Sequence, residues 1–132
     1  MIRHMLAAGH PCGWCADLEP RGDGIPSFDA LAIEHSPSGC FITNPPWSRP
    51  ILHALIDHLS KLAPTWMLID ANWANTKQSA PLIPYCRIIQ PVGRLIWMPG
   101  TKMTGKDDCA WFLFDQTTPS PTAGPVFFPR LP

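Results

Sequence analysis

The hydrophobic pattern is clearest between residues 49 and 62, where apolar side chains recur at intervals of three and four. This period places them on one face of a helix. Ser48 precedes the segment as a helix N-cap residue, Pro50 lies in the first turn, and Pro64 follows the last apolar position. The sequence therefore predicts an amphipathic helix over residues 49–62. Its apolar face carries Ile51, Leu52, Leu55, Ile56, Leu59 and Leu62.

Shorter apolar runs elsewhere in the chain predict buried strands, because each is bounded by residues that favour turns. The runs cover residues 12–16, 39–43, 65–70, 87–98 and 109–114. Within 87–98, the best strand pattern is at residues 94–98. Two more short helices are expected, one over residues 2–8 with Gly9 as its C-cap and one over residues 78–86, interrupted by proline.

The alternation of strands and helices is typical of an α/β fold. The chain has 132 residues, which is the size of one domain. We expect the α/β domain to cover residues 1–115. Residues 116–132 are rich in Pro, Thr, Ser and Gly without any period and are expected to form a Pro-rich C-terminal tail. Phe127 and Phe128 suggest that this tail docks on the domain.

Composition narrows the functional classes. No apolar run is long enough to span a membrane and no signal peptide is recognisable, so we expect a cytoplasmic protein without a membrane partner. Five cysteines at irregular spacing argue against a disulfide scaffold. The net charge of zero argues against a freestanding nucleic-acid binder. Basic residues predominate only after residue 76, with six basic and three acidic side chains.

The segment Asn44-Pro45-Pro46-Trp47 directly follows the expected strand at residues 39–43. Two consecutive prolines donate no backbone N–H and stiffen the turn, which leaves its carbonyls without local partners. The Asn44 side-chain oxygen and a neighbouring carbonyl can then accept hydrogen bonds from one –NH2 group while the indole stacks on the ring that carries it. This pattern predicts a pocket for the exocyclic amine of a nucleobase. A Pro-rich loop with a packed Trp is the structural alternative.

The NPPW segment resembles the catalytic motif of the S-adenosylmethionine-dependent amino-methyltransferases, which methylate adenine N6 or cytosine N4 in DNA. The run from Lys106 to Trp111 is similar to that of phage and prophage members. The resemblance implies that Asn44 and the Pro45 carbonyl orient the amine, with Pro46 stiffening the turn, and that Trp47 holds a base flipped from the helix. It also implies a partial Rossmann-like sheet with a C-terminal antiparallel hairpin, with DNA as partner.

The same resemblance places the cofactor S-adenosylmethionine near Asp17, for its ribose, and Asp29, for its adenine; solvated surface carboxylates are the alternative. The family's first strand and glycine-rich turn have no counterpart before residue 9. We therefore expect the first strand to be missing from the sheet. The strand at residues 12–16 pairing with that at 39–43, a second copy or partner chain, a rearranged N-terminal third, or a reading frame that starts upstream would each resolve the gap.

Several further residues have two interpretations. Trp73 follows a strand end, where it lines the base pocket or belongs to the core or its rim. Lys102 and Lys106 contact DNA or are ordinary solvated charges. Cys12 and Cys15 form a CxxC pair, but two further zinc ligands are not apparent, so buried free thiols are favoured over a redox or metal site and no metal is expected.

Three functions follow from these observations. The favoured one is a truncated or divergent DNA adenine-N6 or cytosine-N4 methyltransferase-like protein. It is not expected to be active alone, and it transfers the methyl group directly when active. The alternative is a non-catalytic binding or assembly module that reuses the half-fold as a homo-oligomer. A CxxC redox protein is the third.

Overall fold

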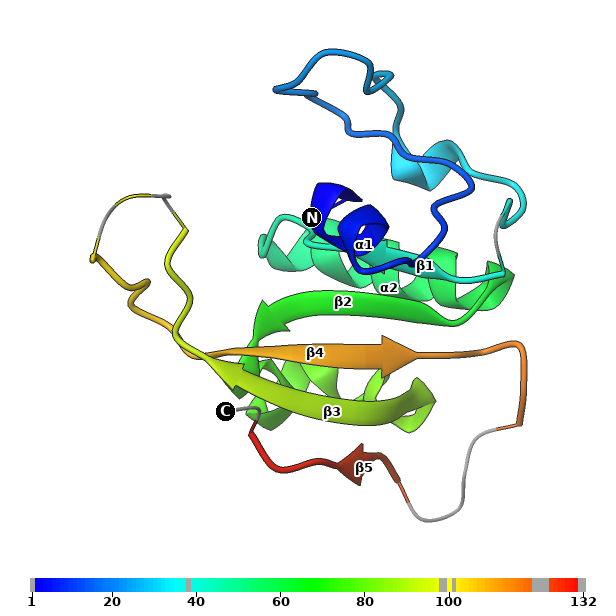
Figure 1. Cartoon of the computed structure of the whole chain (residues 1–132). Coiled ribbons are helices and arrows are strands. Elements are labelled where there is room, and N and C mark those ends of the chain that lie inside the picture. The colour runs from blue at the N-terminus through cyan, green and yellow to red at the C-terminus, as the bar shows by residue number, and fades with distance from the viewer. Residues whose placement is uncertain (1, 38, 98–99, 101, 120–123, 131–132) are drawn as a thin grey trace.

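The computed structural model describes residues 2–37, 39–97, 100, 102–119 and 124–130. Figure 1 shows a mixed sheet with α2 (Arg49–Leu62) against one of its faces. The fold is therefore a mixed α/β fold with few helices. The bounds of α2 are those that the apolar period predicts, and Pro50 lies in its first turn.

The sheet has five strands within the described residues, in the order β1-β2-β4-β3-β5. β1 and β2 run parallel, β4 runs antiparallel to both β2 and β3, and β5 runs parallel to β3. The predicted C-terminal antiparallel pair is thus confirmed as β3 with β4. The strands are β1 (Phe41–Thr43), β2 (Thr65–Asp70), β3 (Cys86–Gly93), β4 (Cys109–Phe114) and β5 (Val126–Phe127).

The remaining helical elements are short. The expected N-terminal helix is present, and Gly9 ends it at a φ of 80° that suits glycine. The single helix predicted over residues 78–86 is replaced by two separate 3-10 turns, because Pro81 and Pro84 supply no N–H donor for a continuous helix. These elements are α1 (Ile2–Ala7), η1 (Ala30–Ala32), η2 (Ala71–Asn75), η3 (Lys77–Ser79) and η4 (Ile83–Tyr85).

The prediction of a strand at residues 12–16 is wrong. This segment forms no strand and does not pair with β1. Trp14 instead packs edge-on against Phe28, with ring centroids 5.4 Å apart. The nearby chain is held by an isolated bridge between Asp17 and Ser27. A five-residue apolar run that has no neighbouring strand to pair with is stabilised more by this aromatic contact than by an extended backbone whose polar groups stay unpaired.

The strongest part of the strand predicted at residues 87–98 was also misplaced. β3 ends at Gly93, whose φ of 87° turns the chain out of the sheet. Residues 94–97 therefore lie outside the ladder. Residue 98 is outside the described residues.

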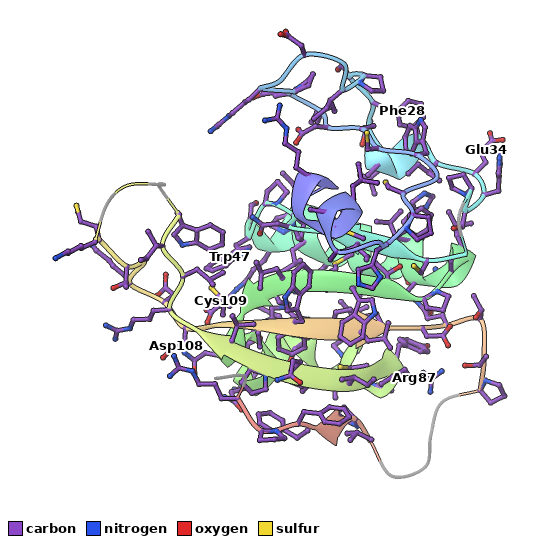
Figure 2. All side chains as sticks on the ribbon, viewed as in Figure 1. Phe28, Glu34, Trp47, Arg87, Asp108 and Cys109 are labelled. Atoms are coloured by element: carbon purple, nitrogen blue, oxygen red, sulfur yellow. The ribbon has the colours of Figure 1, made fainter. Side chains whose placement is uncertain are left out.

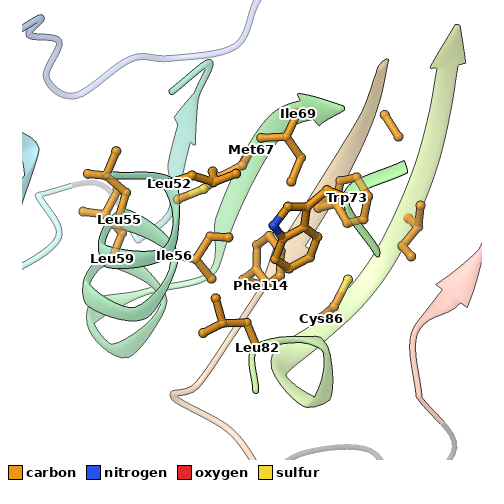
Figure 3. Packing of buried hydrophobic residues seen from close by; sticks show 13 residues of the cluster. Leu52, Leu55, Ile56, Leu59, Met67, Ile69, Trp73, Leu82, Cys86 and Phe114 are labelled. Atoms are coloured by element: carbon orange, nitrogen blue, oxygen red, sulfur yellow. The ribbon is translucent and has the colours of Figure 1, made fainter. Parts of the chain in front are cut away.

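The core lies between α2 and the sheet (Figure 3). Trp73, which is only 4% exposed, packs edge-on against Phe112 and Phe114 at centroid distances of 5.6 and 5.5 Å. Its indole thus joins the segment after β2 to the C-terminal half of β4. The helix contributes Leu52, Leu55, Ile56 and Leu59, and the strands contribute Met67, Ile69, Cys86, Ile89, Ala110, Phe112 and Phe114.

The two outer strands differ in what holds them. β1 is the outer strand on one side, and within the described ranges no further strand pairs with its free edge. On the other side the C-terminal segment docks through β5, with Val126 opposite Ile88 in β3. Arg87 Nη2 fastens the start of this segment by donating to the carbonyl oxygens of Asp115 and Thr118 at 2.8 and 2.6 Å.

Candidate functional site

The turn from Asn44 to Trp47 leaves the carboxyl end of β1 and leads into α2 through Ser48. β2 runs parallel to β1, with Thr43 opposite Met67, so the carboxyl ends of both strands lie at one edge of the sheet. Ligand sites of open α/β sheets occur at this edge. The fold therefore places the NPPW segment where a site is expected.

The Trp47 indole has a fixed orientation. Its Nε1–H donates to the Leu68 carbonyl oxygen of β2 at 3.2 Å. On its outer side the ring meets Trp97 edge-on, with centroids 6.2 Å apart and planes at 76°. Trp47 is half-buried and packs against the core, so the ring is a rigid wall rather than a mobile side chain.

The other three residues of the turn differ in exposure. Pro45 is buried, whereas Asn44 and Pro46 are exposed. Asn44 is therefore accessible to solvent and is not part of the core. The buried Pro45 ring anchors the corner, since a proline also fixes its own φ.

A cavity of about 260 Å³ opens beside this turn. This volume is smaller than the roughly 300–1,000 Å³ of pockets for drug-sized ligands. A cavity of this size suits a single ring system. Asn44 belongs to the turn but does not line the cavity. The cavity is lined by Trp47, Arg49, Leu52, Asp70, Trp73 and Thr76.

The polar groups of the cavity carry both signs of charge. Asp70 ends β2, and its Oδ1 accepts a hydrogen bond from the Asn72 backbone N–H at 2.9 Å. Arg49 begins α2, and its guanidinium donates to the Gln78 side-chain oxygen. The cavity thus presents a carboxylate and a guanidinium around two indole rings, a combination that can bind a polar aromatic ring.

Trp73 is buried in the core and also lines the cavity. Its Nε1–H donates to Nε2 of His53 at 3.1 Å. An indole N–H is a donor only, so His53 Nε2 must be the unprotonated, accepting nitrogen. Burial, and then the charge of Arg49, lower the pKa of His53, which favours this neutral form.

Asp17 and Asp29 lie in the N-terminal third, and each uses one carboxylate oxygen locally. Asp17 Oδ1 accepts from the Glu19 backbone N–H at 3.0 Å, and Asp29 Oδ1 accepts from that of Leu31 at 2.9 Å. A second, more open cavity has a volume of about 310 Å³, and its lining includes Phe28, the sequence neighbour of Asp29. It is lined by Trp14, Phe28, Ala32, Ile33, Glu34, His35 and Pro37.

Lys102 and Lys106 are exposed and lie outside both cavities, in the segment between β3 and β4. Cys12 and Cys15 are half-buried thiols, and the Cys12 thiol donates to the Trp14 carbonyl oxygen at 3.2 Å. In the part of the chain that the structure describes, no three His, Cys, Asp or Glu side chains come together as metal ligands.

Sequence reasoning missed three polar residues of the first cavity: Arg49, Asp70 and Thr76. Asp70 carries a signal that could have been used, since it is the last residue of a strand predicted within an α/β fold. Arg49 begins α2 and Thr76 follows η2, and both reach the cavity only through tertiary packing, which no local pattern encodes.

No protein-family model, curated protein or solved structure matches the chain. None of its described helices has the length and apolar character needed to cross a membrane.

Proposed function

We propose that the chain is related to the DNA amino-methyltransferases and that the cavity beside the NPPW turn holds the amine-bearing base of adenine or cytosine. The observation that carries this proposal is the position of Trp47: an indole from that turn lines a cavity at the carboxyl ends of two parallel strands. Asn44, an exposed residue of the same turn, is proposed to supply a hydrogen-bond acceptor.

The sheet gives independent support for a Rossmann-like relationship. The resemblance implies parallel strands followed by an antiparallel hairpin, and β1 and β2 are parallel while β4 is antiparallel between β2 and β3. The helix expected after the NPPW turn is α2, which returns the chain to β2 as a parallel crossover requires. If the NPPW segment were only a Pro-rich loop with a packed Trp, none of these features of the sheet would be required.

The proposed chemistry uses the turn as a rigid acceptor. Asn44 Oδ1 and the Pro45 carbonyl oxygen accept hydrogen bonds from the two N–H groups of the exocyclic amine. These bonds turn the nitrogen lone pair away from the ring and stabilise the positive charge that grows on the nitrogen. Trp47 stacks on the base. S-adenosylmethionine, when bound, supplies the electrophilic methyl group. Transfer would break the methyl–sulfur bond and release S-adenosylhomocysteine. The methylated amine would then lose one proton, for which Asp70, a carboxylate that lines the cavity, is the proposed acceptor.

The fit to the cofactor is partial. The aromatic walls of the second cavity, Trp14 and Phe28, suit a flat adenine ring, and Asp17 and Asp29 each keep one carboxylate oxygen outside their local hydrogen bonds. The described residues supply no glycine-rich turn for the methionine end. The chain would therefore need a partner that supplies this turn before it could catalyse methyl transfer.

The assembly module is the second candidate, and the outer position of β1 favours it. A parallel strand at the sheet edge presents backbone groups that a strand of another chain can pair with. Equilibrium dialysis with S-adenosylmethionine separates the candidates. Saturable binding supports the methyltransferase relationship, and none at millimolar ligand favours assembly.

The base pocket is tested with mononucleotides. We expect dAMP and dCMP to bind more tightly than dTMP, which lacks an exocyclic amine, as monitored by tryptophan fluorescence and NMR titration. Asn44→Ala should weaken dAMP binding on the order of tenfold, because an acceptor is lost. Asn75→Ala, an exposed asparagine of η2, is the matched control. Equal binding of all three nucleotides, or an Asn44→Ala protein with unchanged affinity, contradicts the proposal.

A further inference from the structure

Two described stretches of the β3–β4 connection, residues 94–97 and 102–108, form a projection that we call the arm (Figure 1). We propose that the arm holds an unpaired DNA strand beside the base pocket, with the Trp97 indole stacking on the base next to the one held by Trp47. This inference rests on the proposed function and names the form of its substrate.

The arm is folded against the site by a specific fit. The Gly105 backbone N–H donates to the Leu95 carbonyl oxygen at 2.8 Å, which ties the two stretches together. The Trp97 ring then lies directly over Gly105: a Cβ at this glycine would stand 2.7 Å from Trp97 Nε1 and 3.1 Å from Cδ1. The bare backbone of Gly105 is therefore what allows the indole to take this position.

From that position Trp97 extends the wall of the base pocket. Its ring meets Trp47 edge-on at 6.2 Å, and Trp47 in turn lines the first cavity. Figure 2 shows the arm rising beside the Trp47 side chain. Trp97 nevertheless stays 46% exposed, so a large part of its surface faces solvent next to the pocket. An indole held on one side and exposed on the other is a stacking platform.

The rest of the arm has the composition of a single-strand binding surface. Exposed cations alternate with exposed apolar side chains, among them Ile96 and Met103. Proteins that bind single strands combine cationic tracks for phosphates with aromatic rings for bases. The cations are Arg94, Lys102 and Lys106, and the acidic side chains are Asp107 and Asp108.

The charge pattern favours a strand with unpaired bases over a duplex. Arg94 Nε and Asp108 Oδ1 are 4.0 Å apart and both side chains are more than half exposed, so this pair is too loose to hold Arg94 away from a phosphate. Three cations and two carboxylates give the arm a net charge of only +1, which is weak for a duplex backbone. Stacking must supply the remaining affinity, and only unpaired bases offer their faces to Trp97.

The test is the binding of a fluorescein-labelled single-stranded DNA 12-mer and its duplex, measured by anisotropy at low and moderate salt. We expect the wild-type protein to prefer the single strand. Trp97→Ala should weaken that binding on the order of tenfold, as loss of one stacking contact does. Gly105→Ala should have a similar effect, because its methyl group displaces the indole.

Matched controls exclude general damage. Phe127→Ala removes an exposed aromatic side chain of β5 that lines neither of the two cavities, and Gly22→Ala places a methyl group that meets only Ile25 Cδ1, at 4.0 Å. Both should bind the 12-mer as the wild type does. Thermal unfolding checks that every variant is folded.

The outcomes separate this inference from the proposed function. If Asn44→Ala weakens dAMP binding but Trp97→Ala leaves the affinity for the 12-mer unchanged, the inference about the arm is wrong while the base pocket remains supported. If the 12-mer does not bind the wild-type protein at all, or the duplex binds as well as the single strand, the inference is also wrong. Trp97-dependent preference for the single strand supports it.

Discussion

The indole N–H of Trp73 donates to Nε2 of His53 across 3.1 Å, and this bond joins the core to the wall of the candidate site. His53 lies on α2, and Trp73 lies in η2 beyond the end of β2. Because the indole can only donate, the bond exists only while His53 is neutral. Protonation of one imidazole therefore breaks a contact that positions a ring of the cavity.

The first prediction is that the protein loses stability as the pH falls below about 6.5, the ordinary pKa of histidine. The pKa of His53 is lowered by burial and by Arg49, so the unfolded chain takes up this proton at a higher pH than the folded protein does. His53→Gln keeps an acceptor that does not titrate. It should flatten the dependence of the melting temperature on pH between 8 and 5.

His10→Gln is the control, since His10 is exposed and lies far from this bond in sequence. It should leave the pH profile unchanged. A His53→Gln protein that still follows the wild-type profile would show that another group governs the acid sensitivity.

The second prediction concerns Asp115, a buried carboxylate that follows β4. Its burial acts to raise the pKa, but hydrogen bonds from Thr117 and Thr118 and the charge of Arg87 outweigh burial and lower it. The carboxylate accepts bonds of 2.8 Å from Thr117 N–H, 2.6 Å from Thr117 Oγ1 and 2.7 Å from Thr118 Oγ1. Asp115→Ala should cost about 2 kcal/mol of unfolding free energy at pH 7.

Urea unfolding at several pH values measures this cost. A depressed pKa contributes stability above the unfolded pKa, 3.8, and that stability is lost as the pH falls through the folded pKa. The wild type and Asp115→Ala should thus converge in acid. Asp23→Ala, at an exposed loop position, is the control and should change stability by less than about 0.5 kcal/mol.

The third prediction is a division among the five thiols. Burial raises the pKa of Cys86 to about 12, and burial with nearby carboxylates raises that of Cys109. These two should not react with a thiol reagent at pH 8 until the protein is unfolded, because the thiolate is the reacting species. Cys12, Cys15 and Cys40 are at least partly exposed and should react in the native state.

Peptide mass spectrometry after alkylation assigns the reacted thiols. Modification of Cys86 in native protein would mean that β3 opens readily or that the core is not packed as described. Full protection of both Cys12 and Cys15 would point to a disulfide or a bound metal at the CxxC pair.

The sequence correctly predicted the helices and strands whose apolar pattern is matched by a packing partner in the fold. The helix at residues 49–62 and the strands at 65–70 and 109–114 have the expected bounds, because a continuous apolar face met a core that could bury it. The run at 12–16 had equal apolar content but no ladder partner. Apolar content alone therefore did not distinguish a strand from a loop with a packed aromatic ring.

The candidate site was predictable only where one segment builds it. The NPPW turn occupies the strand end that its sequence implied. Trp97 looked like a core residue of a strand, but Gly93 turns the chain and Gly105 makes room for the ring, so the indole reaches the site from outside the sheet. That outcome depends on two glycines twelve residues apart, which no periodic pattern links.

The last prediction is the order of amide hydrogen exchange across the sheet. β4 is paired on both sides, and Phe112 and Phe114 are fully buried, so its amides should exchange most slowly. β1 is an outer strand and should exchange faster than β2, which lies inside the sheet. At low protein concentration we therefore expect protection in the order β4, then β2, then β1. If β1 protection instead rises to that of β4 with protein concentration, a second copy pairs with its free edge, which supports the assembly function.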